Sequence, residues 1–590
     1  MYDGIHDPKI AIDDALAEDR IMAFVNKWKN DTSYLNNGGS LLIALNEYAA
    51  LRADYMYWTK SDGYYRMLSE ITQDDEIKAL SNKSSEKSKD LMVSLNFFTI
   101  SLKEVSKKQQ SMFLNDECLS VYHHFLALLF DSAKHTLSNE EEKIISIMSK
   151  TGLSNWIKMI EDFLSLQKGL IIFSDWTEKE VSLSELWGYI NNQDPYLREQ
   201  AAMQFYRIIN DHVDVAEVEI NSVLEHKKII DKLRDFERPE SSRHLKDNVP
   251  TDVVNALVDA VSSANSIAND YYTFKAELLG FDKFQYHEKN LAYVGIGDEK
   301  MYTFEEAYTI VKKTLSKVDK EFEDFFTKYV SLGRIDALPK EWKRGGGFNV
   351  WFWKNVGSAI LMNFTGKLID IITLAHEMWH AIHAERSCKQ NALYYGHGWM
   401  FVAEVGSTFI ENFVYDTLIE DADNETKLSL LVSRLDLIVS WVFRQIAGYR
   451  FEQELHKTFR ETWYVSSDKI WIIFKKYMSE YMWPSVEQNE WSENRWVHWR
   501  HFRYFFYIYT YASGDLISQS LHALIKENPS FIHDIKQNFY SVGWAKSPVD
   551  IFASMGLDIT KKEFWQKWVT QIWHILEQAK TLARKLWKIK

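Results

Sequence analysis

The motif His376-Glu377-Met378-Trp379-His380 combines residue types and a spacing that suit metal-dependent hydrolysis. On a helix, two histidines four residues apart lie on one face, so both imidazoles can bind a single cation. Glu377 follows the first histidine directly, which lets its carboxylate face a metal-activated water rather than bind the metal. Zinc lowers the pKa of that water, and the glutamate accepts the proton. The motif therefore predicts a catalytic zinc site with Glu377 as general base.

A third metal ligand is predicted at Glu404, in the segment 401–409 (FVAEVGSTF). The motif alone is not decisive, because chance would produce H-E-x-x-H in a chain of this composition with a probability of roughly a few per cent. A catalytic zinc takes three protein ligands and keeps one position open. Glu404 has apolar neighbours, so its carboxylate should project inward from a helix, where a cation would offset the cost of burial. An ion pair with a buried arginine is the alternative. We predict one Zn²⁺ per chain, bound by His376, His380 and Glu404.

The aromatic segment 496–514 (WVHWRHFRYFFYIYTYASG) offers hydrogen-bond donors. Attack of water on a peptide carbonyl creates an oxyanion, and a phenol or imidazole donor placed beside it lowers the barrier by a few kcal/mol. Tyrosines at alternate positions fit either a strand face or an aromatic stripe on a helix, and burial is their commoner role. The segment alone leaves open which of its histidines and tyrosines act as donors.

Three stretches resemble the core of the M3 peptidases, in particular the oligoendopeptidase F branch: residues 343–348 (KRGGGF), 360–377 (ILMNFTGKLIDIITLAHE) and 401–411 (FVAEVGSTFIE). Weaker similarity lies at 271–282 and 496–514. The resemblance implies a mainly α, two-lobed, clam-like helical zincin fold, with a small β-sheet beside the active-site helix and a deep substrate channel. It also implies cleavage of short peptides rather than folded proteins. Because it places a His and Tyr pair in the last segment, we assign His501, Tyr504 and Tyr511 as catalytic donors.

One departure from the family pattern is Trp379, since family members usually have glycine before the second zinc histidine. An indole at that position requires the neighbouring space to be remodelled. The predicted function is that of a zinc-dependent metalloendopeptidase, which hydrolyses internal bonds of short oligopeptides. Two alternatives remain: a zinc carboxypeptidase or dipeptidyl-type peptidase on the same scaffold, and a catalytically silent peptide-binding protein.

The site must be positioned by a largely helical chain. Only 8 Pro and 23 Gly in 590 residues leave room for long helices. Asp194 followed by Pro195 is a good helix start, and we place a boundary there between an N-terminal helical lobe, 1–194, and a catalytic domain, 195–590. Helices are predicted over residues 91–105, 117–133, 196–232, 251–279 and 304–332 and from 367 onward, with a polar loop at 238–249. A small sheet is predicted within 348–364, with an edge strand at 360–364 that pairs with substrate backbone.

The composition of the chain limits the kinds of partner and the cellular compartment that we expect. The formal net charge of −14 disfavours a nucleic-acid partner. Two cysteines, Cys118 and Cys388, are too few for a disulfide framework. The amino terminus has no signal-peptide pattern, and no stretch approaches the roughly 20 apolar residues of a membrane span. We expect a cytoplasmic protein with short peptides as substrates and no membrane partner, and leave the oligomeric state open.

Overall fold

The computed structural model describes residues 2–55, 58–69, 71–72, 74–294, 301–340, 343, 346–352, 354, 357–394, 399–489 and 492–590. Within this part of the chain the protein is mainly helical, as predicted, and its few strands are short. The chain divides into two compact units, each assembled from three stretches of sequence. The predicted domain boundary at residue 194 stays a prediction.

The first unit comprises Met1–Asn139, Lys300–Trp399 and Ile525–Met555. Its N-terminal α-helices are α1 (Pro8–Asn30), α2 (Gly38–Asp54), α3 (Lys60–Ser69), α4 (Asp75–Ser94), α5 (Asn96–Lys103), α6 (Lys107–Asn115) and α7 (His123–Ala133). Its later elements are α16 (Phe304–Val318), α17 (Lys320–Ser331), β4 (Ile335–Asp336), β5 (Phe348–Trp351), β6 (Ser358–Leu361), α18 (Leu368–Ser387), α25 (Ile532–Ile535), the π-helical turn η7 (Lys536–Tyr540) and α26 (Pro548–Ala553). Short 3-10 turns are η1 (Ser33–Leu35), η2 (Glu117–Tyr122), η4 (Ala392–Tyr394) and η6 (Pro529–Phe531).

The second unit comprises Glu140–Glu299, Met400–Leu524 and Gly556–Lys590. Its first elements are α8 (Asn139–Ser149), the π-helical turn η3 (Lys150–Ser154), α9 (Asn155–Ser165), β1 (Lys168–Ile172), β2 (Glu178–Ser182), α10 (Leu183–Ile190), α11 (Pro195–Asp211), α12 (Val213–Leu233), α13 (Ser241–Lys246), α14 (Thr251–Ser262), α15 (Asn265–Leu279) and β3 (Phe284–Gln285). The others are α19 (Met400–Ala403), α20 (Val405–Glu420), α21 (Asn424–Trp441), α22 (Phe443–Thr462), α23 (Ser467–Met482), β7 (Val486–Glu487), η5 (Arg500–Arg503), α24 (Tyr509–Glu527) and α27 (Lys562–Lys585).

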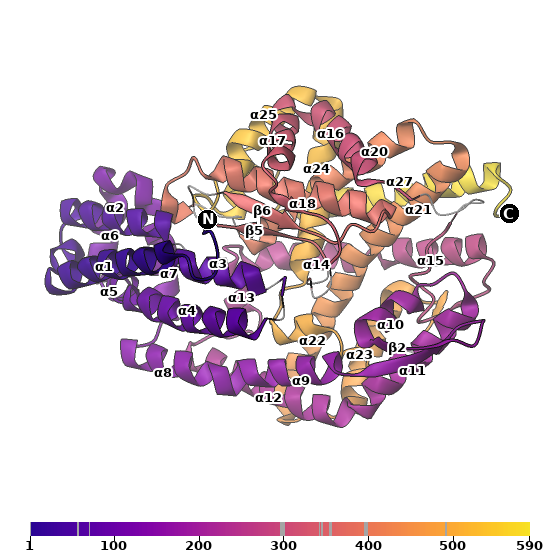
Figure 1. The fold of residues 1–590 in the computed structure, drawn as a ribbon, viewed down its shortest axis with the longest axis horizontal. Helices are drawn as coiled ribbons and strands as arrows, with labels where there is room; N and C mark the ends of the chain where they lie inside the picture. Colours follow the sequence, from indigo (N-terminus) through magenta and orange to yellow (C-terminus); the bar gives the residue numbers. More distant parts are fainter. Residues whose placement is uncertain are drawn as a thin grey trace. The chain divides into compact units, whose positions relative to one another are not determined.

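The N-terminal helices of the first unit share an aromatic core. Phe98 is fully buried, and its ring lies 5.1 Å from those of Tyr34 and Tyr48 and 5.4 Å from that of Phe24. These side chains come from α1, η1, α2 and α5, and Figure 1 shows the three helices close together. Offset and edge-to-face ring pairs of this kind add stability beyond the apolar area that they bury.

A three-stranded sheet in the first unit has the order β4-β6-β5, in which β6 pairs parallel with β4 and antiparallel with β5. The expected strand at 360–364 is therefore present as β6, but the expectation that it forms a sheet edge was wrong. Its second partner, β4, contains only two residues, too few to leave an alternating pattern in the sequence. Among the described strands, β5 is the edge neighbour of β6 on the other side.

The helix α18, which contains the H-E-x-x-H motif, is buried on nearly every side. It packs against α16, α17, β5, β6 and η7, and Figure 1 shows it beside the two strands. Asp370 fixes its start, because the carboxylate accepts hydrogen bonds from the backbone N–H of Lys367 at 3.0 Å and of Thr365 at 2.7 Å. Arg386 fixes its end through an ion pair of 2.5 Å with Glu321 of α17. The motif is thus carried on a helix anchored at both ends.

Several predicted boundaries differ from those observed. Asp194 does cap α11, with Pro195 in its first turn, as predicted. The predicted helices 251–279 and 304–332 are each two helices, broken at residues 263–264 and at Asp319, where the Asp319 carboxylate caps α17. The predicted loop 238–249 contains α13, and the predicted helix 117–133 begins as the 3-10 turn η2. The β1–β2 hairpin was missed, because its exposed strands have little apolar alternation.

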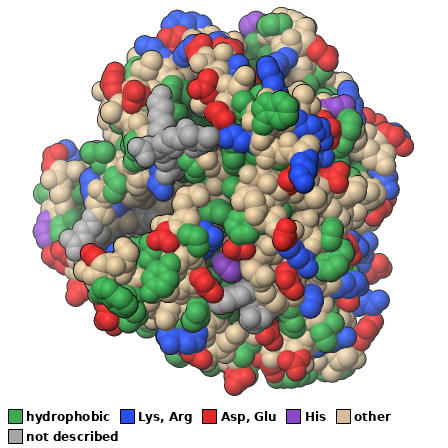
Figure 2. Space-filling view, turned by 90° about the vertical axis from the view of Figure 1, so that its right-hand side faces the viewer, with side chains coloured by type: hydrophobic (Ala, Val, Ile, Leu, Met, Phe, Trp, Pro, Cys, Tyr) green, Lys and Arg blue, Asp and Glu red, His purple; other side chains and the backbone are tan. Residues whose placement is uncertain are grey.

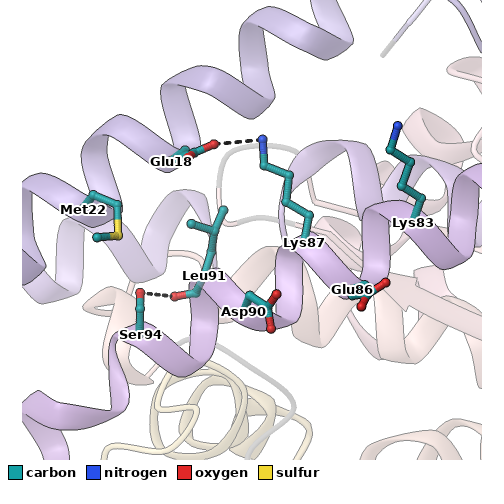
Figure 3. A pocket seen from close by; sticks show the side chains of 8 residues that line it. All are labelled: Glu18, Met22, Lys83, Glu86, Lys87, Asp90, Leu91 and Ser94. Carbon is teal, nitrogen blue, oxygen red and sulfur yellow. Dashed lines mark hydrogen bonds and ion pairs between the residues drawn. The ribbon is translucent and has the colours of Figure 1, made fainter.

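A groove of about 430 Å³ lies between α1 and α4 (Figure 3). Mixed charges line it, and an ion pair of 2.9 Å joins Lys87 of α4 to Glu18 of α1. None of the predicted site residues lines this groove. Charges of both signs are also interspersed over the face drawn in Figure 2. No helix in the described part of the chain is long and apolar enough to cross a bilayer.

Candidate active site

The two motif histidines lie on one face of α18 and point their Nε2 atoms toward each other. The Nε2 atoms of His376 and His380 are 3.3 Å apart, and the ring planes make an angle of 75°. Two nitrogen ligands of a tetrahedral zinc ion, each at about 2.05 Å from it, lie about 3.3 Å apart. The pair therefore has the separation that a shared ion requires.

Glu404 completes a group of three possible metal ligands. One ligand atom from each of His376, His380 and Glu404 lies within 4.8 Å of the other two. All three residues are partly buried, and the set of two imidazoles and one carboxylate is typical of catalytic zinc. The prediction that Glu404 lies inside a helix was wrong, because Glu404 lies at the junction between α19 and α20.

The Glu404 side chain is fixed by neighbours in its own unit. The Ser407 hydroxyl, which is fully buried, donates to Glu404 Oε2 at 2.9 Å, and the Thr408 hydroxyl donates to the Glu404 carbonyl at 2.7 Å. On the other side, a Cβ added to Gly514 of α24 would lie 2.9 Å from the Glu404 Cβ. Glycine at 514 thus allows α24 to pack directly against the ligand. These residues were not predicted as part of the site, although Ser407 and Gly514 stand within the motifs that carry the resemblance.

Glu377 is buried beside the start of β5. Its side chain is only 6% exposed, and a Cβ added to Gly347 would lie 3.5 Å from Glu377 Cγ and 2.7 Å from Thr373 Cγ2. Glycine at 347 therefore allows the start of β5 to approach the motif helix closely.

Trp379 is buried on another side of α18, in a pocket that accounts for the departure from the family pattern. Its ring packs edge-to-face on Phe322 of α17 at 4.8 Å and on Tyr540 of η7 at 4.9 Å. His383 also contacts the Tyr540 ring, at 5.4 Å, and burial lowers its pKa to about 3. Both side chains belong to the packing of α18, and His383 is outside the metal-ligand group.

A second cluster in the second unit joins His501, Tyr507 and Tyr511. The rings of His501 and Tyr507 stack 5.5 Å apart at an angle of 5°. The Tyr507 hydroxyl donates to the Tyr511 oxygen at 3.1 Å, and that oxygen lies 3.3 Å from His501 Nε2. The structure thus brings together two of the three predicted donors and adds Tyr507, which sequence analysis passed over.

The third predicted donor, Tyr504, lies apart from this cluster. Its side chain is 41% exposed, and its hydroxyl accepts a hydrogen bond from Arg500 at 3.0 Å and lies 3.5 Å from Glu161 of α9. The turn after η5 separates it from the other tyrosines, because α24 begins only at Tyr509. Alternation in the sequence could not reveal that turn.

The His501 cluster consists of neutral donors. Burial, with the charges of Arg444 and Arg500, lowers the pKa of His501 to about 4. Burial and the nearby Glu404 carboxylate raise the pKa of both Tyr507 and Tyr511. The phenols therefore keep their protons near neutral pH and remain able to donate. Glu404 and this cluster both belong to the second unit.

The chain is similar to known peptidases. The sequence profile of Peptidase family M3 matches residues 189–570, and that of Oligopeptidase F matches residues 102–160. An oligoendopeptidase F homolog of Borreliella burgdorferi is 24% identical over 533 residues, covering 88% of this chain and 87% of the relative. Oligopeptidase PepF of Bacillus subtilis is 21% identical over 458 residues, covering 77% and 68%.

Solved structures share the fold. Oligoendopeptidase-F from Enterococcus faecium has a TM-score of 0.74 at 17% identity and covers 98% of this chain and 99% of its own. PZ peptidase A, solved with an inhibitor, has a TM-score of 0.76 at 16% identity, with coverages of 96% and 97%. The predicted mainly helical fold, with a small sheet beside the motif helix, is confirmed.

The fold and the His-His-Glu group define a metal-dependent peptidase that acts on peptides. Since the matching profile spans more than half of its residues, the chain belongs to peptidase family M3, as the resemblance implied.

Proposed function

We propose that the protein is a zinc-dependent oligoendopeptidase, which cleaves internal bonds of short peptides. The observation that carries the proposal is the group of His376, His380 and Glu404, whose ligand atoms lie within 4.8 Å of one another in a chain of family M3. Two imidazoles and one carboxylate suit zinc, which supplies Lewis acidity to the carbonyl and the attacking water. The oligopeptidase names of the relatives support short substrates. The free cysteines favour a cytoplasmic location.

Glu377 would move the proton. A buried carboxylate next in sequence to a ligand histidine can take a proton from the attacking water and return it to the departing amine. His501 and Tyr511 would donate hydrogen bonds to the developing oxyanion, with Tyr507 supporting the Tyr511 hydroxyl. Tyr504 remains a prediction, and its exposed ring fits contact with the peptide better than contact with the oxyanion.

The edge of the sheet offers a binding mode for extended peptides. β5 pairs with β6 on one side, and the close approach of Gly347 to Glu377 puts the start of β5 beside the proposed general base. A peptide that pairs with β5, the edge strand among those described, would bind through its backbone, which would make cleavage tolerant of many side chains.

The test is cleavage of an internally quenched peptide of about ten residues, before and after removal of metal by a chelator and again after addition of zinc. We expect internal cleavage that is lost with the metal and restored by zinc, with both fragments seen by mass spectrometry. Release of only terminal residues would favour the carboxypeptidase or dipeptidyl alternative. Binding without cleavage by protein that holds one zinc per chain would favour the silent peptide-binding protein.

A further inference from the structure

The backbone between His501 and Tyr511 makes a turn that is unfavourable for its own residues. Phe505 and Phe506 both have a φ of 53°, in the left-handed region where a side chain is crowded by the backbone. Two consecutive non-glycine residues in this conformation persist only where the surrounding structure holds them. Since the turn separates His501 from Tyr507 and Tyr511, its conformation decides whether the three rings meet.

Glu452 of α22 holds this turn through the backbone N–H of Phe506. The Phe506 backbone N–H donates to Glu452 Oε1 at 2.7 Å, and Glu452 is fully buried. The other carboxylate oxygen is buried and has no hydrogen-bond partner within the described part of the chain. One turn further along α22, the His456 ring packs 4.8 Å from the ring of Phe506. A buried carboxyl group is costly unless it is hydrogen-bonded, and the hydrogen bond that Glu452 makes within the described part of the chain is to this turn.

Arg243 of α13 holds the same turn through the backbone carbonyls of Tyr504 and Phe505. Its Nε donates to the Phe505 carbonyl at 3.4 Å and its Nη2 to the Tyr504 carbonyl at 3.3 Å. The guanidinium also lies 5.9 Å from the centre of the Tyr507 ring. The buried carboxylate of Asp247, one turn later on the same segment, lies 3.8 Å from Arg243 and orients it. A planar guanidinium can bridge two successive carbonyls in this way, whereas a lysine ammonium cannot copy the geometry.

We propose that Arg243 and Glu452 are positioning residues for peptide hydrolysis, which lock the turn at 504–507 and thereby keep Tyr507 and Tyr511 against His501. Neither belongs to the proposed ligand group, and each acts through backbone contacts. The inference rests on the proposed function, because it assigns the His501 cluster to the stabilisation of the transition state.

The first experiment compares Glu452→Met, Arg243→Met and Glu452→Gln in the zinc-loaded full chain. Both methionine variants remove a contact to the turn while keeping a long side chain. We expect kcat to fall about tenfold or more with KM within about twofold, because the lost contact matters in the transition state only. Zinc content should stay at the wild-type level. Glu452→Gln should keep most of the activity, since its amide oxygen still accepts the Phe506 N–H.

The second experiment is a double-mutant cycle with Tyr511→Phe. If Arg243 acts through the His501 cluster, Arg243→Met should cost much less activity once the Tyr511 hydroxyl is gone, about twofold or less. A matched control is Arg450→Met on α22, which removes an arginine that pairs with Glu480 instead. This control should keep kcat near the wild-type value in both backgrounds.

Unchanged kcat in both methionine variants would overturn the proposal. So would equal losses in the wild-type and Tyr511→Phe backgrounds, or a loss of kcat as large in the Arg450→Met control. Should Glu452→Met fail to fold, Arg243→Met and its cycle decide the outcome alone, because Arg243 lies on the short helix α13 and is partly exposed. If the wild-type enzyme cleaves peptides and the variants cleave them equally well, only this inference is contradicted. A wild-type enzyme that cleaves nothing defeats the proposed function.

Discussion

At the scale of single residues, neighbouring side chains on α18 have separate tasks. His376 and His380 point their Nε2 atoms toward each other at 3.3 Å, whereas Glu377 is turned toward the start of β5 at Gly347. The residues proposed to bind the metal and the residue proposed to move the proton therefore have different surroundings on this helix. A substitution at Glu377 can remove one task and leave the other.

Glu377→Gln should abolish turnover while zinc stays bound. The amide keeps the shape of the side chain but cannot accept the proton, which should lower kcat by about 10²- to 10⁴-fold. Kinetics together with metal analysis of the purified variant checks both parts. Glu385→Gln is the matched control, because Glu385 lies on the same helix and accepts a hydrogen bond from Tyr329 at 3.0 Å instead. A Glu377→Gln variant with most of its activity would show that another residue is the base.

Tyr511→Phe should be far more harmful than Tyr504→Phe. Removal of one donor to an oxyanion costs about 10²- to 10³-fold in kcat, whereas loss of the exposed Tyr504 hydroxyl should change kcat by less than about threefold. Both substitutions remove a phenolic oxygen from the same segment, so each variant serves as the control for the other. The reverse order of effects would return the donor role to Tyr504.

The sequence predicted the residue types of this site better than their grouping. The fixed spacing of a helix places His376 and His380 together, because residues four apart share a face. No such rule applied to segment 496–514, where the turn at Phe505 and Phe506 sends Tyr504 outward and turns Tyr507 toward His501. A non-glycine residue at positive φ is uncommon enough that no pattern in the sequence predicts it.

At the scale of elements, α18 is a central helix whose every side must be matched by a neighbour. Trp379 meets Phe322 of α17 and Tyr540 of η7, so the departure from the family pattern is absorbed by packing away from the ligand histidines. The same elements are anchored by charge, since Lys536 of η7 lies 2.6 Å from Asp319 and 3.1 Å from Glu321. Restoring the family's glycine would therefore empty a filled pocket.

Trp379→Gly should destabilise the protein by about 3–5 kcal/mol and should not improve activity. The loss combines a large buried ring with the poor helix propensity of glycine. Thermal or denaturant unfolding of the variant measures it. Trp379→Phe serves as comparison, because a smaller ring still contacts Phe322 and should cost less. Wild-type stability in Trp379→Gly would mean that the pocket collapses without penalty.

The helices were predictable and their interruptions were not. Asp194 and Pro195 predicted the start of α11, because an N-cap residue and a proline in the first turn are local sequence signals. The break at Asp319 was hidden, since apolar periodicity continues across it. The two-residue strand β4 also left no pattern, and this caused the error about the edge of the sheet. Partners that are remote in sequence decide such features.

At the scale of the whole molecule, the metal is expected to contribute to stability. An ion that binds only the folded chain stabilises it by mass action, by about 2.7 kcal/mol when free ion is present at 100 times the Kd. The three ligand atoms lie close together only in the folded protein, because His376 and His380 lie on α18 whereas Glu404 lies at the junction between α19 and α20.

Removal of zinc should therefore lower the first thermal unfolding transition by about 2 °C or more, and zinc should restore it. Differential scanning calorimetry with and without chelator measures the shift. Glu404→Gln should show a reduced response to chelator, since one ligand is weakened. An identical transition in apo- and zinc-loaded protein would contradict a metal held by these three residues.

Pairing of peptides with the edge of β5, as proposed, would have a consequence for which peptides are cleaved. A substrate that adds to this edge must offer backbone N–H groups at alternate positions, and proline has none. Peptides with proline at a pairing position should bind weakly, whatever their other side chains, while the same proline shifted by one residue should be tolerated. In a mixture of peptide fragments, the enzyme would then cleave most of the peptides, and the peptides left uncleaved would be enriched in proline.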